Sequence, residues 1–134
     1  MQMRQRPAAL LVEDNPIDHK LARILLEKAG FRVEHAFSAE EALPLIDGPP
    51  FSVVIVDVDL PGMSGFDLTR LVRARPARAG LPILAVSSTT GAEAQTWARA
   101  AGCDAFLPKP LDYGTFVATV ARLARPAGAD QPAA

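Results

Sequence analysis

Short apolar runs alternate along this chain with stretches in which apolar residues recur at helical spacing. Five runs have the length and composition of β-strands, at 8–12, 32–36, 51–56, 82–86 and 104–107. The first, third and fourth runs are almost continuously apolar. Because a strand covered on both faces needs apolar residues on both, these three runs predict the interior of a parallel sheet.

The stretches between the runs predict amphipathic helices. Their apolar stripes begin at Ile17, Ala39, Leu68, Ala94 and Phe116. Residues typical of helix N-termini mark the start of three stripes. Asn15–Pro16 is an N-cap followed by proline, and Ser38–Glu41 and Thr90–Glu93 are capping boxes. Gly30 and Gly102 lie where two of the helices are expected to end.

Strict alternation of five strands with five helices predicts an α/β fold. A strand, a helix and a parallel strand form a right-handed crossover, and successive crossovers build a doubly wound sandwich. We expect this domain to span 8–124, after a flexible N-terminus at 1–7. The Pro/Ala-rich tail at 125–134 has no apolar stripe to bury, so we expect it to be disordered.

Composition narrows the class of protein. The 134 residues suit one domain, and 14 Lys and Arg against 15 Asp and Glu give a net charge of -1, which argues against nucleic acid as a partner. We expect no membrane association, since no apolar run reaches the length of a membrane span or a secretory signal. The single cysteine, Cys103, favours a cytoplasmic location.

Polar residues follow four of the five predicted strands. Glu13 and Asp14 follow the first, Asp57 the third, Ser87 the fourth and Lys109 the fifth. Because the carboxyl ends of parallel strands meet at one edge of the sheet, we expect these side chains to converge. Carboxylates gathered there are costly without a compensating cation, and Mg²⁺ prefers such oxygen ligands. Together with a lysine and a hydroxyl, they indicate phosphoryl transfer to an aspartate.

The residues at these strand ends carry a family resemblance. The matching segments are Leu10-Leu11-Val12-Glu13-Asp14-Asn15, Val53 to Gly65 with Asp57-Val58-Asp59-Leu60-Pro61-Gly62-Met63 at its centre, Val86-Ser87-Ser88, and Phe106-Leu107-Pro108-Lys109-Pro110. In order and spacing they resemble the receiver domain of two-component response regulators over about 8–124. The resemblance implies a flavodoxin-like (βα)5 sandwich whose five-stranded parallel sheet has the order 2-1-3-4-5.

The resemblance also implies a metal site around a phosphoacceptor. Asp57 is expected to accept the phosphoryl group. Asp14 and Asp57 are expected to bind Mg²⁺ (or Mn²⁺) directly, together with the backbone carbonyl of Asp59. Glu13 is expected to act through a metal-bound water.

Three further residues take roles from the same resemblance. Lys109, joined to Pro110 by a peptide bond that is cis in the family, is expected to contact the phosphoryl group. Ser87, where Thr is commoner, is expected to move toward that group. Phe106 stands at the aromatic position that rotates inward when the protein switches.

The implied function is a signalling switch and not an enzyme. The donor is expected to be a phosphohistidine on a histidine kinase or a histidine phosphotransfer domain. The phosphorylated protein is expected to bind a downstream protein through the face formed by the fourth helix, fifth strand and fifth helix. A homodimer through the same face is a further expectation.

Three alternatives stay open. The chain could be an interaction module that keeps the receiver fold without phosphorylation, or a receiver fragment of a hybrid histidine kinase, although Met1 and the tail favour a complete chain. A phosphatase-like hydrolase with an aspartyl intermediate would need a second acid near Asp57. Asp59 has a compatible spacing, but the chain has no substrate-lining insertions.

Two residues allow two interpretations each, and several others are expected to lie at the surface without a functional role. Trp97 fits either the core or an exposed anchor for a partner. The Asp59 side chain either acts on an attacking water or is simply solvated. His19 and His35 lack partners at metal-ligand spacing and are expected at the surface. A run of arginines is expected to form a solvated face: Arg70, Arg73, Arg75 and Arg78.

Overall fold

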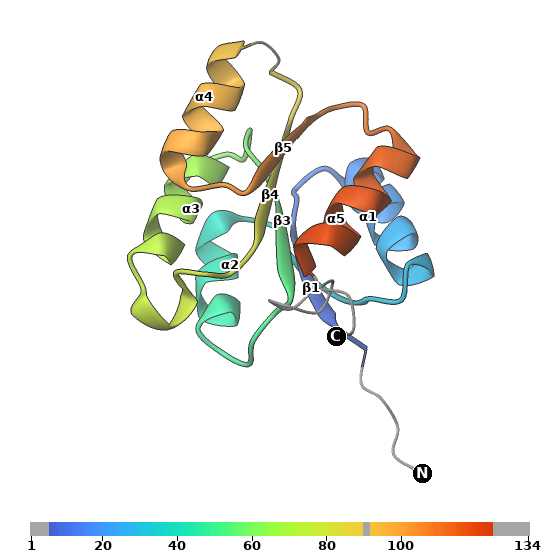
Figure 1. Ribbon diagram of the computed structural model, residues 1–134, viewed down its shortest axis with the longest axis horizontal. Helices are drawn as coiled ribbons and strands as arrows, with labels where there is room; N and C mark the ends of the chain where they lie inside the picture. The colour runs from blue at the N-terminus through green and yellow to red at the C-terminus, as the bar shows by residue number, and fades with distance from the viewer. Residues whose placement is uncertain (1–5, 90–91, 125–134) are drawn as a thin grey trace, which may run out of the picture.

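The computed structural model describes residues 6–89 and 92–124, and a five-stranded parallel sheet lies at its centre (Figure 1). The strands are β1 (Ala8–Val12), β2 (Arg32–Ala36), β3 (Val53–Asp57), β4 (Ile83–Ser87) and β5 (Ala105–Pro108). Their order is β2-β1-β3-β4-β5, and every neighbouring pair is parallel. The predicted fold class and strand order are confirmed.

Helices cover both faces of the sheet. They are α1 (Pro16–Lys28), α2 (Ala39–Ile46), α3 (Gly65–Arg73), α4 (Ala92–Ala101) and α5 (Tyr113–Ala124), with a short 3-10 helix, η1 (Pro76–Arg78), after α3. Figure 1 shows α1 and α5 on one face, and α2, α3 and α4 on the other. The chain therefore changes side of the sheet twice, as a doubly wound sandwich does.

The last three strands each end one residue further along the chain than their apolar runs predicted. Each includes the residue that follows its run, which is Asp57, Ser87 or Pro108. Asp57 pairs with Val86 in β4, and Ser87 pairs with Pro108 in β5. Sheet pairing therefore holds the backbone of these residues, and the site begins inside the strands.

Two hydrophobic cores lie on opposite faces of the sheet. Alternate residues of β1 divide between them: Leu10 and Val12 belong to the core under α2 and α3, whereas Ala9 and Leu11 belong to the core that includes Phe116 of α5. β1, β3 and β4 are buried along their whole length. This confirms that their continuous apolar runs reflect coverage on both faces.

The predicted helix caps are largely present. The Asn15 side chain accepts hydrogen bonds from two backbone N–H groups in the first turn of α1. The Ser38 hydroxyl accepts from the Glu41 backbone at 3.0 Å, but the Glu41 carboxylate accepts from the N–H of Phe37 and not from that of Ser38. The capping box expected there is therefore half formed, because Glu41 reaches one residue further back.

A reciprocal capping box that the sequence analysis missed begins α3. The Ser64 hydroxyl accepts from the backbone N–H of Asp67 at 3.1 Å, and the Asp67 carboxylate accepts from the N–H of Ser64 at 3.3 Å. At the other ends of helices, Gly30 and Gly102 have positive φ angles of 99° and 105°. Both glycines follow a helix as predicted, because L side chains rarely adopt this conformation.

Some expectations fall outside the described residues. These are the Thr90 half of the expected Thr90–Glu93 capping box, nearly all of the N-terminal segment 1–7, and the tail 125–134. Within the described ranges, every helix is too short or too polar to cross a lipid bilayer.

Candidate phosphoryl-transfer and metal site

Three carboxylates meet at the carboxyl edge of the sheet. Glu13 and Asp14 follow β1, Asp57 ends β3, and one oxygen of each lies within 4.8 Å of the others. Glu13 and Asp57 are only 3% and 4% exposed, whereas Asp14 faces solvent. Carboxylates this close repel one another, and hard divalent cations bind through such oxygens. The donor set therefore fits a metal ion, with one side open to solvent.

Lys109 brings the compensating positive charge from the end of β5. Its ammonium group donates to Glu13 Oε1 at 2.9 Å, to Asp18 Oδ2 at 3.0 Å and to Asp57 Oδ2 at 3.2 Å. The peptide bond between Lys109 and Pro110 is cis, as the resemblance implied. The structure thus brings together the predicted acids and the predicted lysine.

Asp18 is a site residue that the sequence analysis missed. It lies in the first turn of α1 and is about half exposed. An acid in a first turn is usually explained by the positive end of the helix dipole, so the sequence carried no distinct signal for a lysine contact. The hydrogen bond from Lys109 spans 91 positions of sequence and depends on how α1 packs beside α5, which follows Lys109 in the chain.

Burial and charge change the acidity of two groups in the site. Burial raises the pKa of the Glu13 carboxyl from 4.5 to about 7; hydrogen bonding to Lys109 opposes the shift, and the neighbouring Asp57 adds to it. Burial alone would lower the pKa of Lys109, but its hydrogen bonds to Glu13 and Asp18 raise it above the ordinary value. Lys109 therefore stays cationic, and Glu13 is a weak acid for a carboxyl group.

The Asp59 side chain is exposed and also makes hydrogen bonds that neither of its predicted interpretations included. Its Oδ2 atom accepts hydrogen bonds from the Ser87 hydroxyl at 2.9 Å and from the backbone and hydroxyl of Ser88 at 3.1 and 3.2 Å. The carboxylate is therefore exposed but also bonded to the end of β4, and its action on an attacking water stays a prediction. The backbone N–H of Asp59 donates to Asp57 Oδ1 at 2.9 Å, which fixes the turn after β3.

The predicted switch residues Ser87 and Phe106 lie outside the acid cluster. Ser87 is 1% exposed, and its hydroxyl is bonded to Asp59. Phe106 is half-buried on β5, where it pairs with Ala85. It lines a hollow of about 160 Å³ between α4 and β5, together with Ala98 and Arg99.

Trp97 is 51% exposed on α4, so the core interpretation is wrong, and its role as an anchor for a partner stays a prediction. Its helix buries alanines instead, namely Ala94, Ala98 and Ala101. The predicted apolar stripe is therefore real, but the indole lies at its outer edge.

The two histidines correct the expectation of isolated surface residues. His19 on α1 and His35 on β2 are partly buried, and their rings stack with centroids 3.5 Å apart. His35 Nε2 lies 2.7 Å from the carbonyl oxygen of Glu13. Burial lowers the pKa of His19, and the neighbouring His35 and Arg23 lower it further. Packing of α1 over β2 brings the rings together, which sequence separation conceals.

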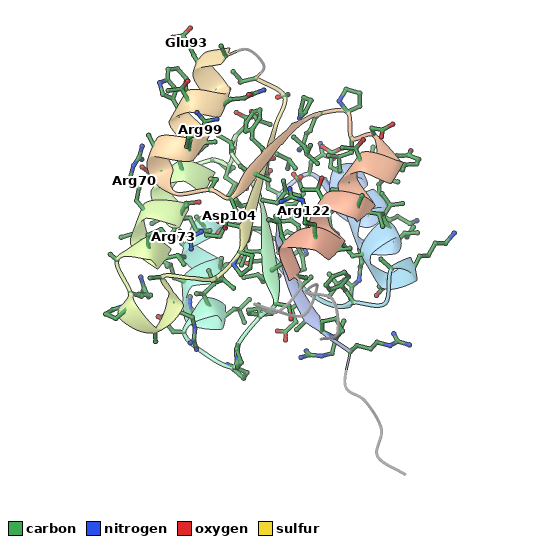
Figure 2. All side chains as sticks on the ribbon, in the orientation of Figure 1. Arg70, Arg73, Glu93, Arg99, Asp104 and Arg122 are labelled. Carbon is green, nitrogen blue, oxygen red and sulfur yellow. The ribbon has the colours of Figure 1, made fainter. Side chains whose placement is uncertain are left out.

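All four arginines expected to form a solvated face donate hydrogen bonds to the protein, and Arg70 does so only to Asp67 on its own helix. Arg73 donates to the carbonyl groups of Ala79, Leu81 and Gly102 and to the Asp104 carboxylate. Arg75 pairs with Asp47, and Arg78 donates to the carbonyls of Ile46 and Gly48. Figure 2 shows Arg73 extending from α3 toward Asp104. Arg70 is the exposed member of this set.

Comparison with known proteins identifies the family. The family model described as response regulator receiver domain matches residues 9–121. The chain is 34% identical over 110 residues to a gliding motility regulatory protein of Myxococcus xanthus, and 32% identical over 119 residues to hybrid signal transduction histidine kinase M of Dictyostelium discoideum. These matches cover 78% and 85% of this chain, but it spans only 14% and 5% of those longer proteins.

Relatives of similar length and solved structures agree with this match. The polar-differentiation response regulator DivK of Brucella ovis is 28% identical over 113 residues, covering 84% of this chain and 92% of DivK. The chemotaxis response regulator CheY4 of Vibrio cholerae has a TM-score of 0.83 at 30% identity, covering 89% of this chain and 99% of CheY4. A receiver protein of Pseudomonas putida has a TM-score of 0.81 at 31% identity, covering 90% and 99%. The chain belongs to the response regulator receiver domain family of two-component signalling.

Proposed function

We propose that this protein is a phosphorylation-dependent signalling switch that accepts a phosphoryl group on Asp57. The observation that carries the proposal is the meeting of Glu13, Asp14, Asp57 and Lys109 at one sheet edge. Response regulator receiver domains interact with histidine kinases or phosphotransfer proteins. The proposed donor is therefore a phosphohistidine on a protein of one of these two kinds.

The acids fit a divalent cation such as Mg²⁺ or Mn²⁺, which prefers oxygen ligands. Asp14 and Asp57 would hold it through their carboxylates, Asp59 through its backbone carbonyl, and Glu13 through a water. The hydrogen bond from the Asp59 N–H to Asp57 supports this role, because it holds the Asp59 backbone beside the acids. When bound, the cation offsets charge on the carboxylate and on the phosphoryl oxygens.

Asp57 acts as the nucleophile in this proposal. One carboxylate oxygen bonds to phosphorus while the bond from phosphorus to the donor histidine nitrogen breaks, and that nitrogen keeps the electron pair. Asp57 Oδ1 is held by the Asp59 N–H and Oδ2 by Lys109, which orients the carboxylate before attack. The Lys109 ammonium then turns to a phosphoryl oxygen, and the Ser87 hydroxyl donates to another.

The output surface is the face formed by α4, β5 and α5. A phosphoaspartate adds roughly two negative charges and three acceptor oxygens, so it attracts Ser87 and Lys109. Movement of the loop after Ser87 would let Phe106 turn inward and change this face. The exposed Trp97 and the hollow beside Phe106 support a protein-binding role here, either for a downstream protein or for a second copy.

The proposed protein is a stand-alone, cytoplasmic switch and not an enzyme that turns over a separate substrate. DivK, of which the chain spans 92%, is an example of the stand-alone form among its relatives. The single cysteine supports a reducing compartment. The match to the hybrid histidine kinase, of which the chain spans 5%, supports the alternative of a fragment from a longer kinase.

Intact-mass spectrometry tests the phosphoacceptor directly. The protein is incubated with Mg²⁺ and a small phosphodonor such as acetyl phosphate. We expect a mass gain of about 80 Da, from one phosphoryl group replacing a hydrogen, that Asp57→Ala abolishes. Omission of the metal with EDTA should suppress the gain.

A wild-type protein that stays unmodified under these conditions, while a known receiver domain is modified in parallel, would support the interaction module without phosphorylation instead. Measurement of turnover on phosphoester substrates separates the switch from a hydrolase. We expect no turnover.

A further inference from the structure

The Asp59 carboxylate collects hydrogen bonds from the end of β4. Oδ2 of Asp59 accepts from Ser87 Oγ at 2.9 Å, from Ser88 N at 3.1 Å and from Ser88 Oγ at 3.2 Å. On its other side, Ser87 Oγ accepts from the backbone N–H of Thr89 at 3.0 Å. The buried Ser87 hydroxyl therefore has both a donor and an acceptor in the unmodified protein.

A hydroxyl group carries one proton and donates one strong hydrogen bond. The proposed function requires the Ser87 proton to point to a phosphoryl oxygen on Asp57, and in the structure it points to Asp59. We propose that Asp59 is a positioning residue that holds the Ser87 hydroxyl away from Asp57 and thereby opposes the change to the phosphorylated conformation. This inference rests on the proposed function of Asp57 as phosphoacceptor.

Charge makes the two acceptors direct competitors. The Asp59 N–H donates to Asp57 Oδ1 at 2.9 Å, so the two residues are anchored beside each other. An anionic acceptor forms a stronger hydrogen bond than a neutral one, so Asp59 holds Ser87 firmly until a second anion is placed on Asp57. The phosphoryl group must therefore outcompete an existing charge-assisted hydrogen bond.

Ser88 makes the exchange reversible. When Ser87 leaves, Asp59 keeps the backbone and hydroxyl donors of Ser88, and its exposed position gives it access to water. No buried charge is left without a partner, which would otherwise oppose the change strongly. The hydrogen bond from Ser87 to Asp59 is thus the only Asp59 contact that favours the unmodified state.

Beryllofluoride, a mimic of the phosphoryl group, provides the probe. Its apparent dissociation constant in Mg²⁺ is measured by ¹⁹F NMR for wild type, Asp59→Asn and Asp59→Ala. Asp59→Asn removes the charge and keeps a carbonyl acceptor for Ser87, whereas Asp59→Ala removes both. We expect Asp59→Ala to bind about ten-fold more tightly than Asp59→Asn, the factor for one neutral hydrogen bond of about 1.4 kcal/mol.

The same pair of variants is then compared in a Ser87→Ala background. Because the hydroxyl is absent there, we expect the ten-fold difference to disappear. Ser88→Ala is the matched control, since it removes another hydroxyl from the same Asp59 oxygen and should leave the affinity unchanged. In the unmodified proteins, the backbone amide shifts of the segment 87–89 should move in Asp59→Ala more than in Asp59→Asn.

The outcomes separate this inference from the proposed function. Equal affinities of Asp59→Ala and Asp59→Asn, or a difference that persists with Ser87→Ala, overturn the positioning role while Asp57 stays an acceptor. Absence of a bound fluoride signal in the wild type, as in an Asp57→Ala control, overturns the proposed function and this inference together. A hydroxyl-dependent difference with an unchanged Ser88→Ala supports both.

Discussion

The ammonium group of Lys109 lies 3.2 Å from Oδ2 of Asp57, so the proposed phosphoacceptor is already paired in the unmodified protein. The same group also contacts Glu13 and Asp18, and Asp14 adds a further carboxylate at this edge. One cation thus faces an excess of acids. The carboxylates that the site needs therefore destabilise the fold by repelling one another, unless a divalent cation offsets their charge.

We expect Asp57→Asn to stabilise the metal-free protein while abolishing its phosphorylation. Two unit charges about 5 Å apart repel by roughly 3 kcal/mol at an effective dielectric constant of 20, and the weakened Lys109 contact offsets part of the relief. A net gain of about 1 kcal/mol in the free energy of unfolding follows. Urea unfolding in EDTA measures it. Mg²⁺ should then stabilise the wild type more than the variant. A variant less stable than the wild type in EDTA contradicts the prediction.

Glu13 is expected to make the stability of the metal-free protein depend on pH. Burial raises its pKa from 4.5 to about 7 in the folded protein. A carboxyl whose pKa is raised by folding contributes stability that is complete below pH 4.5 and is lost as the pH rises through about 7. As the pH is raised from about 5 to about 8 in EDTA, the free energy of unfolding of the wild type should therefore fall relative to that of Glu13→Gln. Parallel pH profiles of the two proteins would show that Glu13 titrates normally.

Gly65 lies against the backbone that carries the phosphoacceptor. A Cβ atom at Gly65 would lie 2.7 Å from the carbonyl oxygen of Asp57 and 3.0 Å from Val58 Cα. Since these neighbours are backbone, Gly65→Ala must displace the turn after β3. We expect it to cost about 1–3 kcal/mol of stability and to slow the phosphorylation of Asp57.

Gly80 is the matched control for Gly65. A Cβ atom at Gly80 meets nothing within 4 Å. Gly80→Ala should therefore stay within about 0.5 kcal/mol of the wild type and keep its phosphorylation rate. Thermal unfolding and the mass-gain assay, run on both variants, measure the two effects. Equal behaviour of the two alanine variants would mean that the close approach to Asp57 has no consequence.

The fold and the acid cluster follow from two properties visible in the sequence. Continuous apolar runs identified the strands covered on both faces, and the polar residue after each run marked the edge where parallel strands end together. Glu13, Asp14, Asp57 and Lys109 could therefore be brought to one place without any coordinates. The pattern needed only the direction of each strand, because neighbouring carboxyl ends share an edge.

The contacts of Asp18 and Asp59 could not be predicted in the same way. Each is a partly exposed acid whose position fits ordinary solvation, and each finds its partner through side-chain placement across 91 or 28 positions of sequence. The stacked pair of His19 and His35 depends likewise on how α1 packs over β2. Sequence periodicity fixes which face a residue takes, but not which side chain it meets there.

Arg73 provides the last prediction, because it was expected to be solvated and instead joins α3 to the chain around β4 and β5. It donates to the carbonyls of Leu81 and Gly102 at 2.7 and 2.9 Å and pairs with Asp104 at 2.9 Å (Figure 2). Arg73→Ala removes the side-chain donor of both carbonyls, while Asp104 keeps the N–H of Ile83, so we expect a loss of about 2–4 kcal/mol in urea unfolding. Arg70→Ala, on the exposed side of the same helix, should cost less than about 0.5 kcal/mol. Similar losses in both variants would mean that the Arg73 hydrogen bonds add no net stability.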